Sequence, residues 1–156
     1  MRIGIIVHSY TGNTYSVAQA IQEKLSAAGH SVSLERITAS DEEQRESGKV
    51  QLIKKPEVDE YDVLIFGAPV RGFSLSPAMT AYLERLKIQR GKKAACFLTQ
   101  FFPLPAMGGK SSMGQMKKLC SSKGIMVCGT GIVNWSNINR KRRITDIADR
   151  FSVLFQ

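Results

Sequence analysis

The sequence predicts an α/β fold in which a five-stranded parallel sheet is doubly wound, with helices on both of its faces. Short apolar runs rich in β-branched residues alternate along the chain with segments whose apolar residues recur at helical spacing. Strands that alternate with helices form right-handed crossovers, and these bury a parallel sheet between two helical layers. The chain has 156 residues, of which 43% are apolar and 22% charged, so we expect residues 1–156 to form a single globular domain.

The first half of the chain predicts two strands, one helix and one region without a clear pattern. Residues 2–7 form an apolar run suited to a buried strand, and residues 31–37 alternate as a second strand does. The helix between them is predicted by Val17, Ala18, Ile21, Leu25 and Ala28, with Gly29 as a stop signal. Residues 38–60 are polar apart from Val50, Leu52 and Ile53, and form either a short helix or a loop that covers one face.

The second half predicts three more strands, at residues 63–70, 94–99 and 125–133. A helix is expected to begin at Ser76 and Pro77, because serine is a preferred N-cap and proline suits the first helical position. Two further helices follow, over residues 111–123 and at the C-terminal end. The apolar residues that define these three helices are Met79, Leu83, Leu86, Met113, Met116, Cys120, Ile144, Ile147, Ala148, Phe151, Leu154 and Phe155.

The charge is strongly positive and unevenly distributed. The net charge is +9, with an isoelectric point of about 9.7. Residues 35–62 hold nine acidic and five basic residues, whereas residues 63–156 hold three acidic and fifteen basic ones. Such a field attracts an acidic protein, a phosphorylated cofactor, nucleic acid or acidic lipid, and solubility alone is the alternative explanation. Nucleic acid is not favoured, because no nucleic-acid-binding motif is present.

The cysteine and histidine patterns argue against a metal site. Cys96, Cys120 and Cys128 form no C-x-x-C pair, which disfavours a disulfide framework, a zinc site and an iron–sulfur cluster, and we expect all three in the core. His8 and His30 lack partners at ligand spacing, so we expect them to make local hydrogen bonds. No apolar run reaches the ~18 residues of a membrane span. The N-terminal run is too short for a signal peptide, and we expect a cytoplasmic protein.

A phosphate-binding motif stands between the first predicted strand and helix. It consists of Ser9, Tyr10, Thr11, Gly12, Asn13 and Thr14. Its hydroxyl groups, its glycine and the following helix N-terminus can bind a phosphate without any Lys or Arg. The alternative is an ordinary turn capped by Thr11 or Asn13, which needs only one of these residues. Two other segments fail: residues 109–111 lack the first glycine of a Walker A motif, and residues 129–131 lack the third glycine of a dinucleotide fingerprint.

Residues 5–14, with Ala18 and Ile21, resemble the signature of flavodoxins. Flavodoxins are FMN-containing electron carriers with a five-stranded parallel sheet of order 2-1-3-4-5. Residues 62–73 are similar to the third strand and first flavin loop of that family, and residues 93–97 resemble its fourth strand. The resemblance, which extends to the length of short-chain flavodoxins, therefore covers most of the chain.

The resemblance implies that FMN is the cofactor and that two loops, residues 68–75 and 99–110, clasp its isoalloxazine ring. The residues expected to bind FMN in these loops are Pro69, Val70, Arg71, Gly72, Phe73, Thr99, Gln100, Phe101, Phe102, Gly108 and Gly109. One of Phe101 and Phe102 is expected to stack on the ring and the other to fill the core. Gly72 matches a family glycine whose peptide can flip, so that its carbonyl accepts a hydrogen bond from the reduced flavin.

Two positions depart from the flavodoxin pattern. Val7 stands where the family usually has an aromatic residue, and Arg71 stands where many members carry a tryptophan over the flavin. No Asp or Glu occurs from Val63 to Leu83, so we expect the Arg71 charge to make the potential for complete reduction of the flavin less negative than is usual in flavodoxins. Arg71 also hints at a different partner or role.

The resemblance leaves two functions open, and the basic charge adds a third. The first is an FMN-binding redox protein that transfers electrons between protein partners, with no catalytic side chain of its own. The alternative is an FMN-dependent NAD(P)H or quinone oxidoreductase on the same fold, and the third is a binding module without turnover. The basic run at residues 140–143 is either a docking face for an acidic partner, such as a ferredoxin or a reductase, or a solvated face. We expect a monomer or a weak homodimer.

Overall fold

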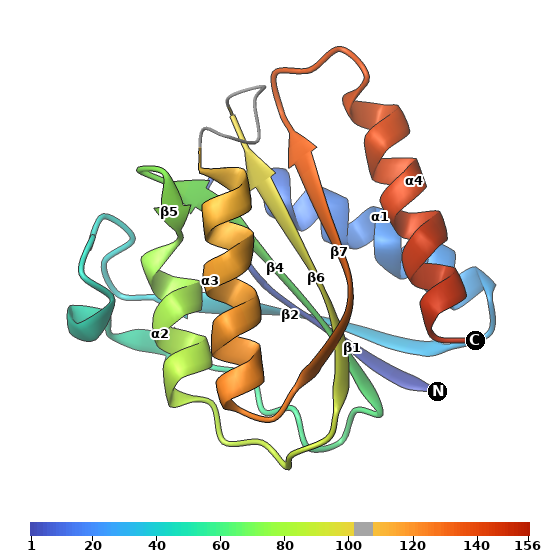
Figure 1. Cartoon of the computed structure of the whole chain (residues 1–156), viewed down its shortest axis with the longest axis horizontal. Coiled ribbons are helices and arrows are strands. Elements are labelled where there is room, and N and C mark those ends of the chain that lie inside the picture. The colour runs from blue at the N-terminus through green and yellow to red at the C-terminus, as the bar shows by residue number, and fades with distance from the viewer. Residues whose placement is uncertain (102–107) are drawn as a thin grey trace.

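The computed structural model describes residues 1–101 and 108–156, in which a mainly parallel sheet forms the centre of the fold (Figure 1). Among these residues, five parallel strands lie in the order β2-β1-β4-β6-β7. Their bounds are Arg2–His8 for β1, Ser31–Ala39 for β2, Val63–Arg71 for β4, Lys93–Gln100 for β6 and Met126–Asn134 for β7. Counted along the chain, this order is 2-1-3-4-5, so the predicted fold class and strand order are confirmed.

Two short antiparallel strands extend the sheet beyond the prediction. β3 (Leu52–Lys54) pairs with β2, and β5 (Ser74–Leu75) pairs with β4. β3 follows a short 3₁₀ helix, η1 (Ser47–Lys49), so the unclear region before residue 60 holds a turn and an edge strand. Its apolar residues diverge: Val50 is buried in a small cluster with Ala78 and Ala81 of the next helix, whereas the Ile53 side chain on the edge strand is exposed.

Four helices in the described chain cover the two faces of the sheet in pairs, as Figure 1 shows. α1 (Asn13–Ala27) and α4 (Arg140–Leu154) pack together on one face, and α2 (Pro77–Arg85) and α3 (Gly109–Ser122) on the other. The core beneath the first pair includes Ile5, Ile21, Ile147 and Phe151, and the core beneath the second includes Phe66, Met79, Leu83 and Met116. No helix in the described part of the chain is long and apolar enough to cross a bilayer.

Local sequence signals set the ends of these helices. The Ser76 hydroxyl accepts a hydrogen bond from the Met79 N–H, and Pro77 begins α2, as predicted. Gly29 follows α1 with φ 94°, a left-handed conformation that glycine adopts at little cost. Because each helix follows the carboxyl end of a strand, the helix N-termini gather at one edge of the sheet.

The three cysteines do not share one environment. Cys96 and Cys120 are buried, as predicted, but Cys128 is exposed, so that prediction was wrong. The reason is that β7 is the last strand in the sheet order. Its first residues alternate between exposed and half-buried positions, and Cys128 occupies one of the exposed ones.

Candidate functional site

The candidate site lies at the carboxyl edge of the sheet, where the strand order reverses. β1 and β4 are neighbours, but the chain continues from β1 to β2 on one side and from β4 to β6 on the other. Ligands of doubly wound sheets bind in the crevice at such a switch point. The start of α1 and the end of β6 meet there: the buried hydroxyl oxygens of Thr14 and Thr99 are 2.8 Å apart and hydrogen-bonded. The predicted phosphate loop and the second predicted flavin loop are therefore brought together.

The loop between β1 and α1 exposes hydrogen-bond donors to an anion. Gly12 has φ 94°, so the chain turns there in a left-handed conformation that favours glycine. Among the described residues, the backbone N–H groups of Tyr10, Thr11, Asn13 and Thr14 make no hydrogen bond. The first turn of α1 contains no acidic residue, and no Lys or Arg occurs from residue 8 to residue 16. Unpaired amides at the start of a 15-residue helix suit a phosphate without any cationic side chain, as the sequence predicts.

Some hydroxyl groups of this loop make hydrogen bonds within the protein that hold the loop in place, and others are exposed. The Ser9 hydroxyl oxygen accepts hydrogen bonds from the N–H groups of Gly12 and Tyr15, each at 3.2 Å, and this keeps the turn closed. Its own proton remains to be donated. The Thr14 hydroxyl is buried against Thr99, whereas the Thr11 side chain is exposed. The structure thus places the motif as a preformed cradle, with Thr11 as its exposed hydroxyl.

Arg71, at the end of β4, is held by the segment that follows β2. Its guanidinium lies 3.9 Å from the ring centroid of Tyr10, in the phosphate loop. The same group donates a hydrogen bond to the Glu42 carbonyl oxygen at 2.5 Å and lies 3.6 Å from the Glu43 carboxylate. Tyr10 in turn donates its hydroxyl proton to Glu43. From the sequence we expect Arg71 to be an unopposed charge, but Glu43 offsets it, so its effect on a bound flavin is smaller than expected.

His8 ties the same segment to the end of β1 and is buried. Its Nε2 lies 2.7 Å from a carboxylate oxygen of Glu42, and its Nδ1 lies 2.9 Å from the Ser76 hydroxyl. Burial lowers the pKa of His8, because the charged imidazolium would lose its hydration, and Glu42 opposes this only in part. In the neutral ring that results, we assign the proton to Nε2, which donates to Glu42, while Nδ1 accepts from Ser76.

The first predicted flavin loop, residues 68–75, and the start of α3 touch at a point where only glycine fits. Gly72 and Phe73 have φ values of 56° and 64°, so both adopt the left-handed conformation. A Cβ atom at Gly108 would lie 2.7 Å from the Phe73 Cα. Phe73 itself carries backbone strain that a non-glycine residue rarely accepts, and such strain clusters at functional sites.

The predicted site residues that the structure describes all lie at this edge. The two segments that contribute beyond the phosphate loop are residues 69–73, at the end of β4, and residues 99–101 with 108–109, around the end of β6. Phe101 is exposed, which fits the role of an outer contact and not of a core residue. Phe102 lies outside the described residues. Sequence reasoning missed Glu42 and Glu43 as parts of this edge, because nothing in a polar segment indicates where it folds.

The family described as NADPH-dependent FMN reductase matches residues 1–139 of the chain. One curated relative, the NAD(P)H dehydrogenase (quinone) of Archaeoglobus fulgidus, is 28% identical over 129 residues. That match covers 71% of this chain but 66% of the relative, so the relative is the longer protein.

Solved structures confirm the fold. Flavodoxin 2 from Bacillus cereus matches with a TM-score of 0.68 and 21% identity, covering 99% of this chain and 100% of that one. A cysteine-to-serine mutant of flavodoxin from Pseudomonas aeruginosa also has a TM-score of 0.68, at 17% identity, covering 99% and 98% of the two chains. A flavoprotein in complex with FMN from Lactobacillus acidophilus has a TM-score of 0.60 and 18% identity, covering 91% and 97%. FMN is the cofactor that the family implies, and the cradle of free amides at residues 10, 11, 13 and 14 fits its phosphate.

Proposed function

We propose that this chain, which belongs to the NADPH-dependent FMN reductase family, is an FMN-dependent oxidoreductase that takes electrons from a reduced nicotinamide dinucleotide and passes them to a quinone or flavin acceptor. The observation that carries the proposal is the preformed phosphate cradle at the start of α1. Its donors are uncharged and already positioned, so a phosphate group gains hydrogen bonds there without reorganising the loop.

FMN, when bound, supplies the redox chemistry, and the chain supplies binding, orientation and electrostatics. The Thr11 hydroxyl and the free amides of residues 10, 11, 13 and 14 would hold the phosphate. The ends of β4 and β6 would flank the ring, because these neighbouring parallel strands end at the same edge of the sheet as the cradle. Thr99, at the end of β6, is joined to the cradle by its hydrogen bond to Thr14, so movement at one of these positions would displace the other.

Two observations favour an enzyme over a carrier. The family and the curated relative are both described as acting with a reduced nicotinamide dinucleotide. In addition, three contacts hold Arg71 toward Tyr10, Glu42 and Glu43, at a position where flavodoxins often carry a tryptophan over the flavin. A side chain held in this way does not cover the ring as an indole does, and a second planar substrate needs that uncovered face.

A single-electron carrier is the second candidate, and the charge distribution favours it. The strongly basic half of the chain suits an acidic redox partner such as a ferredoxin or a reductase, which would dock on residues 140–143. A carrier receives its electrons from a protein and does not react directly with a nicotinamide.

Anaerobic stopped-flow absorbance separates the two functions. The FMN-loaded protein is mixed with NADPH or NADH, and loss of the oxidised flavin band is followed against free FMN at the same concentration. An oxidoreductase bleaches its flavin many times faster than free FMN and regains the band when a quinone is added. If the bound flavin is bleached no faster than free FMN by either nucleotide, but is reduced through a reductase, the chain is a carrier.

A further inference from the structure

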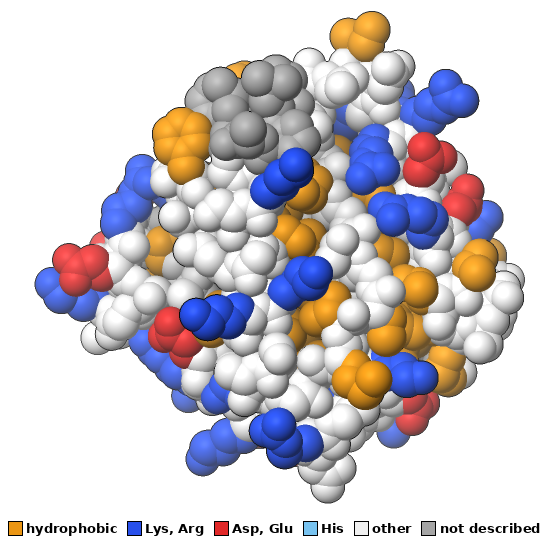
Figure 2. Space-filling model, viewed as in Figure 1, with side chains coloured by type: hydrophobic (Ala, Val, Ile, Leu, Met, Phe, Trp, Pro, Cys, Tyr) orange, Lys and Arg blue, Asp and Glu red, His pale blue; other side chains and the backbone are white. Residues whose placement is uncertain are grey.

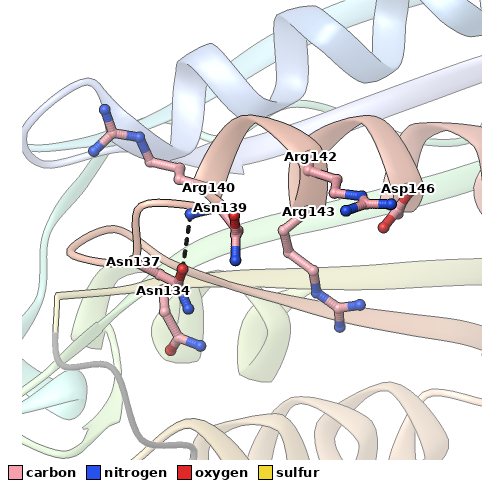
Figure 3. A pocket seen from close by; sticks show the side chains of 7 residues that line it. All are labelled: Asn134, Asn137, Asn139, Arg140, Arg142, Arg143 and Asp146. Atoms are coloured by element: carbon pink, nitrogen blue, oxygen red, sulfur yellow. Dashed lines mark hydrogen bonds between the residues drawn. The ribbon is translucent and has the colours of Figure 1, made fainter.

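A cation-rich cavity lies where β7 passes into α4, outside the flavin crevice. Its volume is about 190 Å³, and its walls hold Asn134, Asn137, Asn139, Arg140, Arg142 and Arg143. Asp146 is its one acidic lining residue. Figure 3 shows Arg142 and Arg143 on one stretch of α4, with Arg140 pointing away from them and Asp146 beside Arg142. Every other lining side chain offers N–H donors, so the cavity suits an anion.

The donors of this cavity are only partly used within the protein. The Arg143 Nε donates to the Ile132 carbonyl oxygen at 3.1 Å, which holds the guanidinium in place and leaves its terminal nitrogens to donate elsewhere. Arg142 makes no hydrogen bond or ion pair among the described residues. Arg140 is committed to Trp135, since it donates to its carbonyl oxygen at 2.7 Å and lies 4.5 Å from its ring centroid. Arg142 and Arg143 are therefore the two guanidinium groups available to a ligand.

The residues at the start of α4 are unfavourable for the stability of the helix. α4 opens with Arg140, Lys141, Arg142 and Arg143, no acidic residue lies in its first turn, and its N-cap makes no side-chain hydrogen bond. Cations at a helix N-terminus repel its dipole and one another. Figure 2 shows the surrounding face, where Lys and Arg side chains are far more prominent than Asp and Glu. A bound anion would relieve this conflict, and a local conflict of this kind is expected at a functional site.

The cavity adjoins the second flavin loop. The Asn134 side-chain oxygen accepts a hydrogen bond from the Gln100 amide at 2.5 Å, and the Trp135 N–H donates to the Gln100 carbonyl oxygen at 2.7 Å. Gln100 is the last residue of β6 and begins the loop that is expected to flank the flavin. A molecule bound along the ends of β6 and β7 can therefore place one end at the flavin and the other in the cavity.

We propose that this cavity binds a phosphate monoester and is the subsite for the 2′-phosphate of NADPH, an assignment that rests on the proposed function. Pockets that hold a whole ligand measure about 300–1,000 Å³, so a cavity of about 190 Å³ fits one charged group of a larger molecule. A guanidinium group recognises phosphate through two parallel hydrogen bonds, and arginine is the residue that accommodates a 2′-phosphate. NADH lacks this group and gains nothing from the cavity.

The test compares NADPH with NADH in two variants of the FMN-loaded protein. Arg142→Gln with Arg143→Gln should lower kcat/KM for NADPH about tenfold or more through KM, because charge-assisted hydrogen bonds are lost. The kcat and the NADH reaction should stay nearly unchanged. Lys141→Gln removes one charge from the same helical turn without altering the cavity lining, and should affect both nucleotides little. Equal losses with NADPH and NADH would overturn the assignment and leave a general electrostatic role.

Binding without turnover keeps this test separate from the proposed function. Calorimetric titration of the oxidised protein with 2′-AMP, adenosine and inorganic phosphate measures the subsite directly. The 2′-AMP should bind more tightly than adenosine, and the difference should vanish in the double arginine variant but persist in Lys141→Gln. If phosphate alone binds as tightly as 2′-AMP, the cavity takes free phosphate and not the nucleotide. If 2′-AMP and adenosine bind alike, the subsite does not exist, whether or not the protein reacts with NADPH.

Discussion

The helices α1 and α4 pack together on one face of the sheet and begin at the same edge, yet their first turns have opposite chemistry. α1 begins after Gly12 with free amides and hydroxyls and no charged side chain. α4 begins with four consecutive basic residues. Both arrangements attract anions, but the first does so through the backbone and the second through cationic side chains. The same edge can therefore hold the phosphate of a permanently bound cofactor at the start of α1. It can also bind and release the phosphate of an exchanging substrate at the start of α4.

Removing hydroxyls at the start of α1 should produce the largest effect. Thr11→Ala with Thr14→Ala should weaken FMN binding at least about tenfold, because the exposed Thr11 hydroxyl would lose a charge-assisted hydrogen bond to the phosphate worth about 1.5–3 kcal/mol. The Thr14 substitution also removes the buried hydrogen bond to Thr99 that holds the start of the cradle in place. Fluorescence titration of FMN measures the change. Ser16→Ala is the control, since the Ser16 hydroxyl donates to the Asn13 carbonyl oxygen on the exposed side of the helix. Unchanged affinity in the double variant would show that the loop does not hold the cofactor.

The second largest difference should appear when the ionic strength is raised, because the cradle at α1 is uncharged and the cavity at α4 is cationic. FMN binding at the uncharged cradle should change little between low and high ionic strength, whereas KM for NADPH should rise clearly, because exposed guanidinium groups are screened. The comparison uses the same protein in both titrations. An FMN affinity that falls with salt as steeply as NADPH affinity would mean that basic side chains, not amides, hold the flavin phosphate.

Substitutions at the N-caps of α1 and α4 should change the free energy of unfolding by different amounts. Gly12→Ala meets no atom within 4 Å, so its cost should come from φ 94° alone, about 1 kcal/mol. Asn139→Ala at the N-cap of α4 should cost less than about 0.5 kcal/mol, below the usual range, because its side chain makes no cap bond. Gly114→Ala, inside α3 with open space around it, should stabilise by about 0.5–1 kcal/mol. Urea unfolding measures all three, and a neutral Gly12→Ala would mean that the turn relaxes freely.

The smallest effect concerns the titration of His8, which joins the end of β1 to Glu42 in the segment after β2. The pKa of His8 is lowered below its ordinary value of 6.5, chiefly by burial, with Arg71 and Arg36 adding to the lowering and Glu42 opposing it. The unfolded chain therefore binds a proton at a pH where the folded chain does not. The free energy of unfolding should fall as the pH drops through 6.5 and level off below the folded pKa.

His8→Gln removes this titration and serves as the comparison. Its free energy of unfolding should change less than that of the wild type between neutral and mildly acidic pH. Parallel curves for the two proteins would show that the His8 pKa is the same in the folded and unfolded chain.

The parallel sheet and the phosphate loop were predictable because both depend on local pattern. The run at residues 2–7 indicates a buried strand by composition, and Ser76 with Pro77 marks a helix start by chemistry that acts within one turn. The loop at residues 9–14 is a local motif of the same kind. For these elements, adjacent residues carry the whole signal.

The contacts around Arg71 were not predictable, because they join residues far apart in the sequence. Residues 63–83 contain no acidic residue, but Glu43, in a polar segment after β2, lies beside Arg71 in the fold. The Asn134–Gln100 hydrogen bond similarly joins two strands. Cys128 shows the same limit: its strand was predicted, but only the sheet order reveals that this strand is at the edge.

Whether the start of α1 holds the phosphate of FMN is tested most directly by comparing FMN with riboflavin. The two differ only in the phosphate group, so calorimetric titration of both into the flavin-free protein isolates that contribution. We expect one FMN per chain, bound about 100-fold or more tightly than riboflavin, because several charge-assisted hydrogen bonds are made to the phosphate alone. Equal affinities for FMN and riboflavin would contradict the account.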